Sequence, residues 1–218
     1  MTDASQPKRS RARALARQAL QAGQPTAWFE TLYREAAEGS AVVPWADLEP
    51  NPMLVEWLDR ELVSPGRTLE VGCGYGDNSA ELARRGFDVL AFDVSQSAVA
   101  RAEERFGDRV DWHACHAART PDTWGHFALI VEIYTLQVLP PELRAEVAAH
   151  LATRLAPGGK LLIICRGRDD GSEPTDPLPW PLTRREIEAI GLEVERFEDF
   201  MDDEDPPVRR FRALLRRD

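Results

Sequence analysis

The sequence predicts an α/β fold in which helices cover both faces of a mostly parallel sheet. Short apolar segments alternate with amphipathic ones from residue 67 onward, which is typical of parallel sheets. The first of these apolar segments leads directly into a glycine-rich turn and then into a helix. The chain of 218 residues is long enough for a single domain with a full core.

The N-terminal quarter is predicted to be helical. Residues 1–24 form a basic, alanine-rich extension that we expect to be partly disordered, with a helix over 11–21. Thr26 is the expected N-cap of a helix that ends at Ala37, because aromatic and aliphatic residues recur there at helical spacing. A proline-punctuated linker precedes another helix over 52–62. We expect 25–64 to form a lid and a covering helix, and 25–218 to be one domain.

From residue 67 onward, predicted strands and helices alternate along the chain. We expect strands over 67–71, 87–93, 110–115, 127–133, 160–165, 192–200 and 208–215, and helices over 78–85, 96–106, 141–155 and 184–190. Ser95 is a predicted N-cap, and Thr183 with Glu186 forms a capping box. The last two strands would be an antiparallel pair, joined by an acid-rich, proline-rich tip that we interpret as a solvated turn rather than a metal site.

The glycine-rich turn is the main candidate for ligand binding. Gly72, Gly74 and Gly76 alternate after the strand at 67–71, and Asn78 opens the next helix. Asp77 stands where a dinucleotide fingerprint requires glycine, and the lysine of a phosphate-binding P-loop is absent.

Acidic residues surround this turn. Glu70 precedes the glycines, Asp77 follows them, and Asp93 ends the next strand. Carboxylates at these places would repel a diphosphate but attract a ligand that carries an ammonium and a sulfonium, which describes S-adenosylmethionine (SAM). An acid at the tip of the second strand is also well placed to accept hydrogen bonds from both ribose hydroxyls.

The acid-flanked glycine turn, together with Asp93, resembles the first two motifs of class I SAM-dependent methyltransferases. The resemblance runs from about Leu69 to the C-terminus and implies a Rossmann-like seven-stranded mixed sheet in the order 3-2-1-4-5-7-6. The segments around 28–33, 43–47 and 179–183 are similar to small-molecule enzymes of the thiopurine, thiol/halide and tellurite-resistance type.

This resemblance implies SAM as cofactor, S-adenosylhomocysteine as product, and a set of residues around them. The implied cofactor-binding residues are Tyr33, Trp45, Glu70, Gly72, Gly74, Gly76, Asn78, Asp93, Val94, His116, Glu132 and Tyr134. His116 replaces the acid that contacts adenine in many relatives, and a solvated loop histidine is the alternative interpretation. Glu132 would add negative charge near the methionine ammonium; its alternative is a solvated strand end.

The methyl acceptor is expected to be a small molecule with a soft nucleophile, such as a thiol. Trp28, Tyr33, Arg166 and Trp180 are the candidate substrate-binding residues, and Arg168 is a second cation for an anionic substrate. No catalytic base is assigned, since neither an Asn-Pro-Pro-Tyr motif nor a clear His-Asp pair is found. The alternatives are an N- or O-methyltransferase, a non-catalytic SAM-binding module and, with less support, an RNA methyltransferase.

The composition of the chain limits the kinds of partner and bound metal that we expect. The formal net charge of −10 opposes general nucleic-acid binding, although five basic residues lie between positions 8 and 17. No apolar run is long enough to cross a bilayer, and no signal core is present. Three cysteines without Cys-x-x-Cys spacing suggest neither a disulfide framework nor a zinc site. We therefore expect a cytoplasmic monomer or weak dimer without a bound metal.

Overall fold

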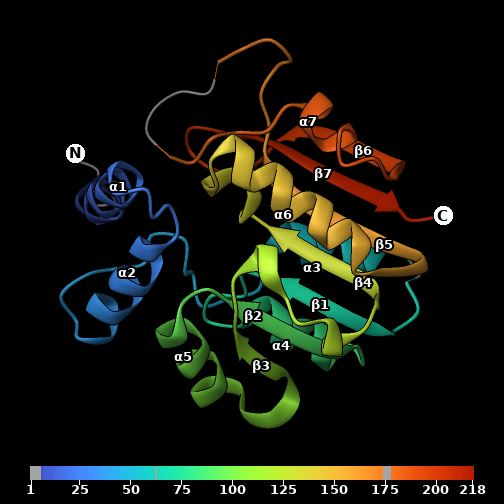
Figure 1. The fold of residues 1–218 in the computed structure, drawn as a ribbon, viewed down its shortest axis with the longest axis horizontal. Coiled ribbons are helices and arrows are strands. Elements are labelled where there is room, and N and C mark those ends of the chain that lie inside the picture. The colour runs from blue at the N-terminus through green and yellow to red at the C-terminus, as the bar shows by residue number, and fades with distance from the viewer. Residues whose placement is uncertain (1–5, 62, 174–177) are drawn as a thin grey trace.

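The computed structural model describes residues 6–61, 63–173 and 178–218, and shows a seven-stranded sheet (Figure 1). The strand order is β3-β2-β1-β4-β5-β7-β6, as predicted; β7 runs antiparallel to β5 and β6, and the other pairs are parallel. The strands are β1 (Arg67–Val71), β2 (Asp88–Asp93), β3 (Asp111–Ala114), β4 (Phe127–Ile133), β5 (Leu155–Arg166), β6 (Glu193–Met201) and β7 (Arg209–Arg216). β5 begins earlier than expected, because the Pro-Gly-Gly turn lies within its paired segment.

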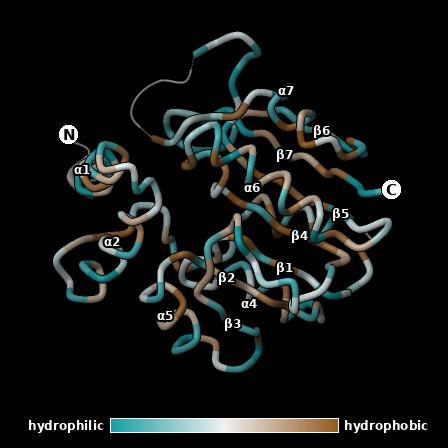
Figure 2. Tube along the Cα trace, in the orientation of Figure 1, coloured by the Kyte–Doolittle hydropathy of each residue, from teal (hydrophilic) through white to brown (hydrophobic). Residues whose placement is uncertain are grey.

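Helices cover both faces of this sheet, and two more lie beside it. The helices are α1 (Gln6–Gln21), α2 (Ala27–Ala37), α3 (Pro52–Arg60), α4 (Asp77–Arg84), α5 (Gln96–Phe106), α6 (Pro141–Thr153) and α7 (Arg184–Glu188). One face packs its strand residues against α6 and α7, and the opposite face packs against α3 and α4. Figure 2 shows that hydrophobic residues concentrate along the central strands, as expected for a sheet buried on both sides.

Three helix starts are fixed by side chains that accept from backbone N–H groups. Asn51 accepts from the N–H of Met53 at 3.0 Å, and Ser95 accepts from the N–H of Ala98 at 3.1 Å. Thr183 forms the predicted capping box with Glu186. Thr26 is the N-cap residue of α2, as expected, although its side chain makes no capping hydrogen bond.

The N-terminal helices form a third layer beside the sheet (Figure 1). α1 is longer than the expected helix at 11–21, and it buries Ala12, Leu15 and Ala16 in a cluster with α2. Arg11 of α1 forms an ion pair with Glu35 of α2. The predicted disorder of the first residues lies outside the described part of the chain, but residues 10–21 pack as an ordered helix.

The tip between β6 and β7 is exposed over residues 203–207, as expected of a solvated turn, and ion pairs hold its two ends. Asp202 accepts from the N–H groups of Glu204 and Val208, and it pairs with the buried Arg210 at 2.6 Å. Glu204 also pairs with Arg210. No group of three or more His, Cys, Asp or Glu side chains suited to a metal ion occurs among the described residues.

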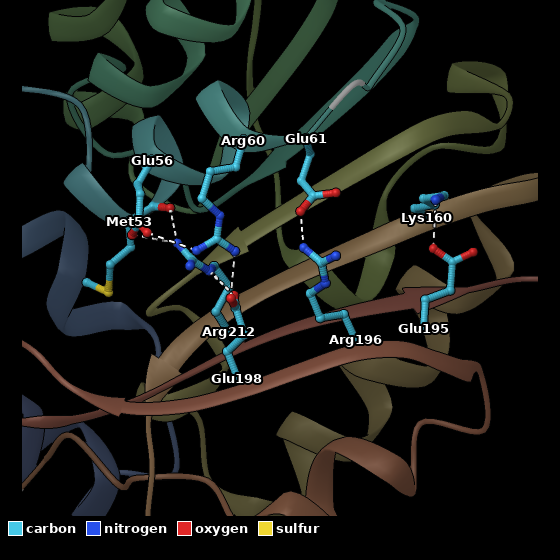
Figure 3. A network of polar contacts seen from close by, with 9 residues as sticks. All are labelled: Met53, Glu56, Arg60, Glu61, Lys160, Glu195, Arg196, Glu198 and Arg212. Atoms are coloured by element: carbon cyan, nitrogen blue, oxygen red, sulfur yellow. Dashed lines mark hydrogen bonds and ion pairs between the residues drawn. The ribbon is translucent and has the colours of Figure 1, made fainter.

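A buried arginine of β7 links α3 to the edge of the sheet formed by β6 and β7 (Figure 3). Arg212 of β7 is 3% exposed, and it donates to the carbonyl of Met53 at 2.8 Å and to Glu56 at 3.1 Å. It also pairs with Glu198 of β6, which in turn pairs with Arg60 at 2.6 Å. Figure 3 places the more exposed pair Arg196–Glu61 on the same face.

We predict that Arg212→Ala lowers the free energy of unfolding by about 2–4 kcal/mol. The substitution removes the hydrogen-bond donor that the Met53 carbonyl and the carboxylates of Glu56 and Glu198 share. Urea unfolding checks the value. Arg196→Ala, which breaks a half-exposed pair on the neighbouring strand, is the matched control and should change stability by less than about 1 kcal/mol. Equal effects of the two substitutions would contradict the role assigned to Arg212.

Candidate functional site

The glycine turn lies where β1 passes into α4, at the edge at which the parallel strands end. Gly72 and Gly76 have φ values of +68° and +84°, a region that side chains rarely adopt. A Cβ at Gly72 would lie 2.2 Å from Oγ1 of Thr135, and a Cβ at Gly76 would lie 2.5 Å from the Trp112 ring. The turn can therefore be built only with glycine at these two positions.

Asp93 lies against this turn. Its Oδ2 accepts from the N–H of Gly74 at 3.0 Å, and its Oδ1 accepts from the N–H of Ser95 at 2.9 Å. The side chain is buried, and desolvation raises its pKa to about 6 although backbone hydrogen bonds act in the opposite direction. A carboxylate with two oxygens has about four acceptor positions. The N–H groups of Gly74 and Ser95, with that of Val94 close by, use two or three of them, which leaves acceptor capacity for a ligand hydroxyl.

The other two acids near the turn face inward. Glu70 is buried behind the glycines and accepts from the Ser79 hydroxyl, and its burial raises its pKa to about 7. Asp77 forms a two-pronged pair with Arg105, with N–O distances of 2.6 and 2.7 Å. Of the three acids expected around the turn, Glu70 and Asp77 are thus engaged with Ser79 and Arg105, and Asp93 hydrogen-bonds to the turn itself.

Aromatic residues of the N-terminal layer lie over the turn. Tyr33 of α2 is 2% exposed, and its hydroxyl lies 2.9 Å from where a Cβ on Gly74 would be. Trp45 donates from Nε1 to this hydroxyl at 3.0 Å, although 40% of Trp45 remains exposed. The ring of Tyr75, from the turn itself, meets Tyr33 edge to face at 5.1 Å.

Trp28 belongs to the same aromatic group. It stacks on Phe29 with ring centroids 3.9 Å apart, and meets Trp45 edge to face at 5.7 Å. Trp28 is 4% exposed, yet its Nε1 has no hydrogen-bond partner within the described residues. Such a buried donor requires an explanation, and one is a ligand acceptor.

The next predicted residues border the turn in different ways. Val94 lies half-buried between Asp93 and the N-cap of α5. His116 follows β3 and accepts at Nδ1 from the N–H of Ala118 at 3.3 Å, so it is not merely a solvated loop residue. Asn78 accepts from the N–H of Asn51 at 2.7 Å and thus links α4 to the start of α3.

The end of β4 contributes a buried acid. Glu132 is 0% exposed, and its Oε1 accepts from the N–H groups of Thr135 and Leu136 at 2.6 and 2.8 Å. The alternative of a solvated strand end is therefore wrong. Tyr134 has a φ of +65°, which is uncommon outside glycine and concentrates at functional sites. Its ring lies under Arg210, on the side of the sheet that α3 covers.

Gln137 connects two candidate substrate residues, Arg166 at the end of β5 and Trp180, to the turn after β4. Its Oε1 accepts from the N–H of Arg166 at 2.7 Å, and its carbonyl accepts from the N–H of Trp180 at 2.7 Å. Sequence reasoning missed Gln137; a lone amide in an otherwise apolar run was the available signal. Arg168 pairs with Glu186 and donates to Pro181 and Ser172, so its guanidinium is committed to the loop rather than to a substrate.

His113 Nε2 lies 2.9 Å from a carboxylate oxygen of Asp111, but it makes no hydrogen bond within the described residues. Asp111 begins β3, at the end of the strand opposite to the glycine turn, and 66% of its side chain is exposed. This pair therefore does not supply a base to the candidate site.

These features suit a cationic nucleoside. The turn excludes side chains at Gly72 and Gly76, a buried acid borders it, and aromatic rings lie over it. A ribose requires acceptors for its hydroxyls, and a sulfonium is compatible with aromatic faces. The residues present therefore fit SAM.

The buried Glu132 makes stability depend on pH. Burial raises the pKa of its carboxyl from 4.5 to about 7, so the folded state holds a proton that the unfolded state has already released between these values. Its contribution to stability is present below pH 4.5 and is lost as the pH rises towards 7.

We predict that Glu132→Gln flattens this pH dependence, because the amide oxygen still accepts from the turn but does not ionise. The free energy of unfolding should decrease less between pH 5 and pH 8 in the variant than in the wild type. The two decreases should differ by about 3 kcal/mol at most. Glu142→Gln, at an exposed acid of α6, should keep the wild-type slope. An unchanged slope in Glu132→Gln would contradict the burial of an ionisable Glu132.

Comparisons with known proteins agree with this geometry. Residues 68–159 match the family model described as a methyltransferase domain. The chain is 37% identical over 110 residues to hemagglutinin 1 of Eikenella corrodens, covering 48% of this chain and 35% of that protein. It is 27% identical over 128 residues to thiocyanate methyltransferase 1 of Arabidopsis thaliana, covering 56% of each. A ubiquinone biosynthesis O-methyltransferase of Aromatoleum aromaticum is 30% identical over 126 residues, covering 56% of this chain and 53% of that one.

Solved structures share the fold. A structure described by the conversion of a disulfide bond into a thioacetal group during echinomycin biosynthesis aligns with a TM-score of 0.73, covering 88% of this chain and 91% of that one at 18% identity. An N-methyltransferase of Bradyrhizobium japonicum in complex with S-adenosylhomocysteine aligns with a TM-score of 0.67, covering 86% and 98% at 22% identity.

The chain spans about a third to just over half of the length of these curated relatives. None of the helices in the described ranges is long and apolar enough to cross a membrane. Residues 68–159 thus match a methyltransferase domain, the fold is shared with solved methyltransferase structures, and a buried acid lies beside the glycine turn, as the resemblance to class I SAM-dependent methyltransferases implies.

Proposed function

We propose that the protein transfers the methyl group of SAM to a small-molecule nucleophile, preferably a soft one such as a thiol. The observation that carries this proposal is the buried Asp93 carboxylate against a turn that only glycines can form. The proposal extends to the domain boundaries: residues 25–218 act as one unit, and 25–64 contribute the lid over the cofactor.

In this proposal, the acceptor capacity of Asp93 holds the ribose hydroxyls, and the glycine turn lets the backbone approach the nucleoside closely. His116 and Val94, beside β3 and β2, border the adenine, and the hydroxyl of Tyr33 points at the cradle from above. When bound, SAM supplies an electrophilic methyl group on a cationic sulfur. The contribution of the protein is positioning and exclusion of water, which can be worth up to about 7–11 kcal/mol.

The walls above the cradle favour a soft and weakly hydrated acceptor. Trp28 and Tyr33 belong to one apolar cluster and Trp180 packs against it, while the Trp45 ring contacts Trp28 and Tyr33. The His-Asp pair lies at the wrong end of β3, so the site offers no evident general base. A thiolate needs none because it arrives as an anion, and Arg166 at the end of β5 is our candidate for meeting its charge.

The names of similar proteins support sulfur chemistry in part. One relative is a thiocyanate methyltransferase, and one structural neighbour concerns a disulfide and a thioacetal. Others are an O-methyltransferase and an N-methyltransferase, so oxygen and nitrogen acceptors form the second candidate. Binding of nucleic acid is not part of the proposal, because the formal charge is −10.

We predict that the wild type binds SAM and that Asp93→Asn binds it about 10–100 times more weakly, since hydrogen bonds to a charged acceptor are lost. Calorimetric titration measures both affinities. Asp88→Asn, at the exposed start of the same strand, is the control and should keep the wild-type affinity. Equal affinities for Asp93→Asn and the wild type would remove the ribose assignment.

The acceptor class is tested by incubating the protein with labelled SAM and panels of small thiols, amines and phenols. We predict that thiols are methylated fastest, and that the rate rises with pH as the thiol ionises. Methylation confined to amines or phenols would overturn the preference for a soft nucleophile while leaving SAM-dependent transfer intact.

A further inference from the structure

Glu30 of α2 joins the N-terminal layer to the start of α5. Its Oε2 accepts from the Ser95 hydroxyl at 2.7 Å and from the N–H of Ser97 at 3.1 Å, and its Oε1 accepts from the Ser97 hydroxyl at 2.6 Å. Although desolvation acts to raise the pKa of Glu30, the hydrogen bonds from Ser97 and Ser95 leave it lowered. The ionised carboxylate is thus the form that this contact stabilises.

Ser95 connects this contact to the ligand cradle. Its hydroxyl donates to Glu30, while its N–H donates to Asp93 at 2.9 Å. Asp93 in turn accepts from the N–H of Gly74. One short chain of hydrogen bonds therefore runs from the lid, through the β2–α5 turn, to the glycine turn.

The same helix carries the residue that lies over the cradle. Tyr33 follows Glu30 by about one helical turn and places its hydroxyl above Gly74. Trp45 is fixed in turn by its hydrogen bond to Tyr33. Tyr33 otherwise meets Trp45 and Tyr75 through ring contacts. Directional polar contacts from α2 to the sheet domain are thus concentrated at Glu30.

We propose that Glu30 is a positioning residue that holds the lid closed over the bound cofactor. This proposal rests on the proposed function, because the bound cofactor is taken to be SAM or its product. Closing the lid brings Glu30 to the two serines, and the shared Ser95 couples this closure to occupation of Asp93 by a ribose. Departure of the product nucleoside then requires these hydrogen bonds to break.

The experiment compares the wild type with Glu30→Gln and Ser97→Ala, using S-adenosylhomocysteine as probe. Ser97→Ala removes one donor to Glu30 without touching Asp93 or Ser95. Glu38→Gln is the matched control, because Glu38 is exposed at the C-cap of α2 and its side chain makes no ion pair or hydrogen bond within the described residues. Three quantities are measured: the dissociation rate of S-adenosylhomocysteine, amide hydrogen exchange over 27–37, and the urea midpoint.

We expect S-adenosylhomocysteine to dissociate about tenfold faster or more from Glu30→Gln, and by a smaller factor from Ser97→Ala, since hydrogen bonds to a charged acceptor are weakened or lost. Amide exchange over 27–37 should rise in both variants, also without ligand, while the urea midpoint and the Glu38→Gln rates stay at wild-type values. An unchanged dissociation rate in Glu30→Gln, with wild-type exchange in α2, would overturn the proposal.

The two proposals fail in different ways. If the wild type binds S-adenosylhomocysteine but the Glu30 and Ser97 variants release it at the wild-type rate, only the lid-closing role falls. If the wild type does not bind S-adenosylhomocysteine, the proposed function falls, and the cofactor role of Glu30 falls with it. A lowered urea midpoint that accounts for the faster exchange would overturn the positioning role in favour of a purely structural one.

Discussion

The site is organised by one desolvated carboxylate, Asp93, which stands between two turns. It fixes the glycine turn through the N–H of Gly74 and the β2–α5 turn through the N–H of Ser95. Burial raises its pKa to about 6, so an unpartnered charge there is unfavourable. Further hydrogen-bond donors would therefore stabilise the carboxylate. Ribose hydroxyls are such donors, whereas phosphates offer only acceptors. The preference for a nucleoside follows from this one group.

The other acids of the region stabilise the scaffold that carries Asp93. Glu70 holds Ser79 of α4 from behind the glycines, Asp77 pairs with Arg105 of α5, and Glu132 caps the turn after β4. Glu70 and Glu132 are buried, and Asp77 is partly buried. The charge next to the glycine turn is therefore set by fewer groups than a count of nearby acids suggests.

Local signals in the sequence predicted most of the fold. Strand β1 and strand β4 have the expected bounds, the cap of α5 is Ser95, and the sheet order is the one implied by the family resemblance. Contacts between distant residues were not predictable. The partners of Glu30 lie about 65 residues away, and Arg105 is 28 residues from Asp77. Alternation and capping motifs describe neighbours in sequence, so pairs that form only after folding leave no local pattern.

Recognition of a ribose by Asp93 is the central claim, and a double-mutant cycle tests it most directly. The affinities of S-adenosylhomocysteine and its 2′,3′-dideoxy analogue are measured calorimetrically for the wild type and for Asp93→Asn. The account predicts that loss of the hydroxyls weakens binding strongly in the wild type and little in the variant. An equal loss in both proteins would contradict it.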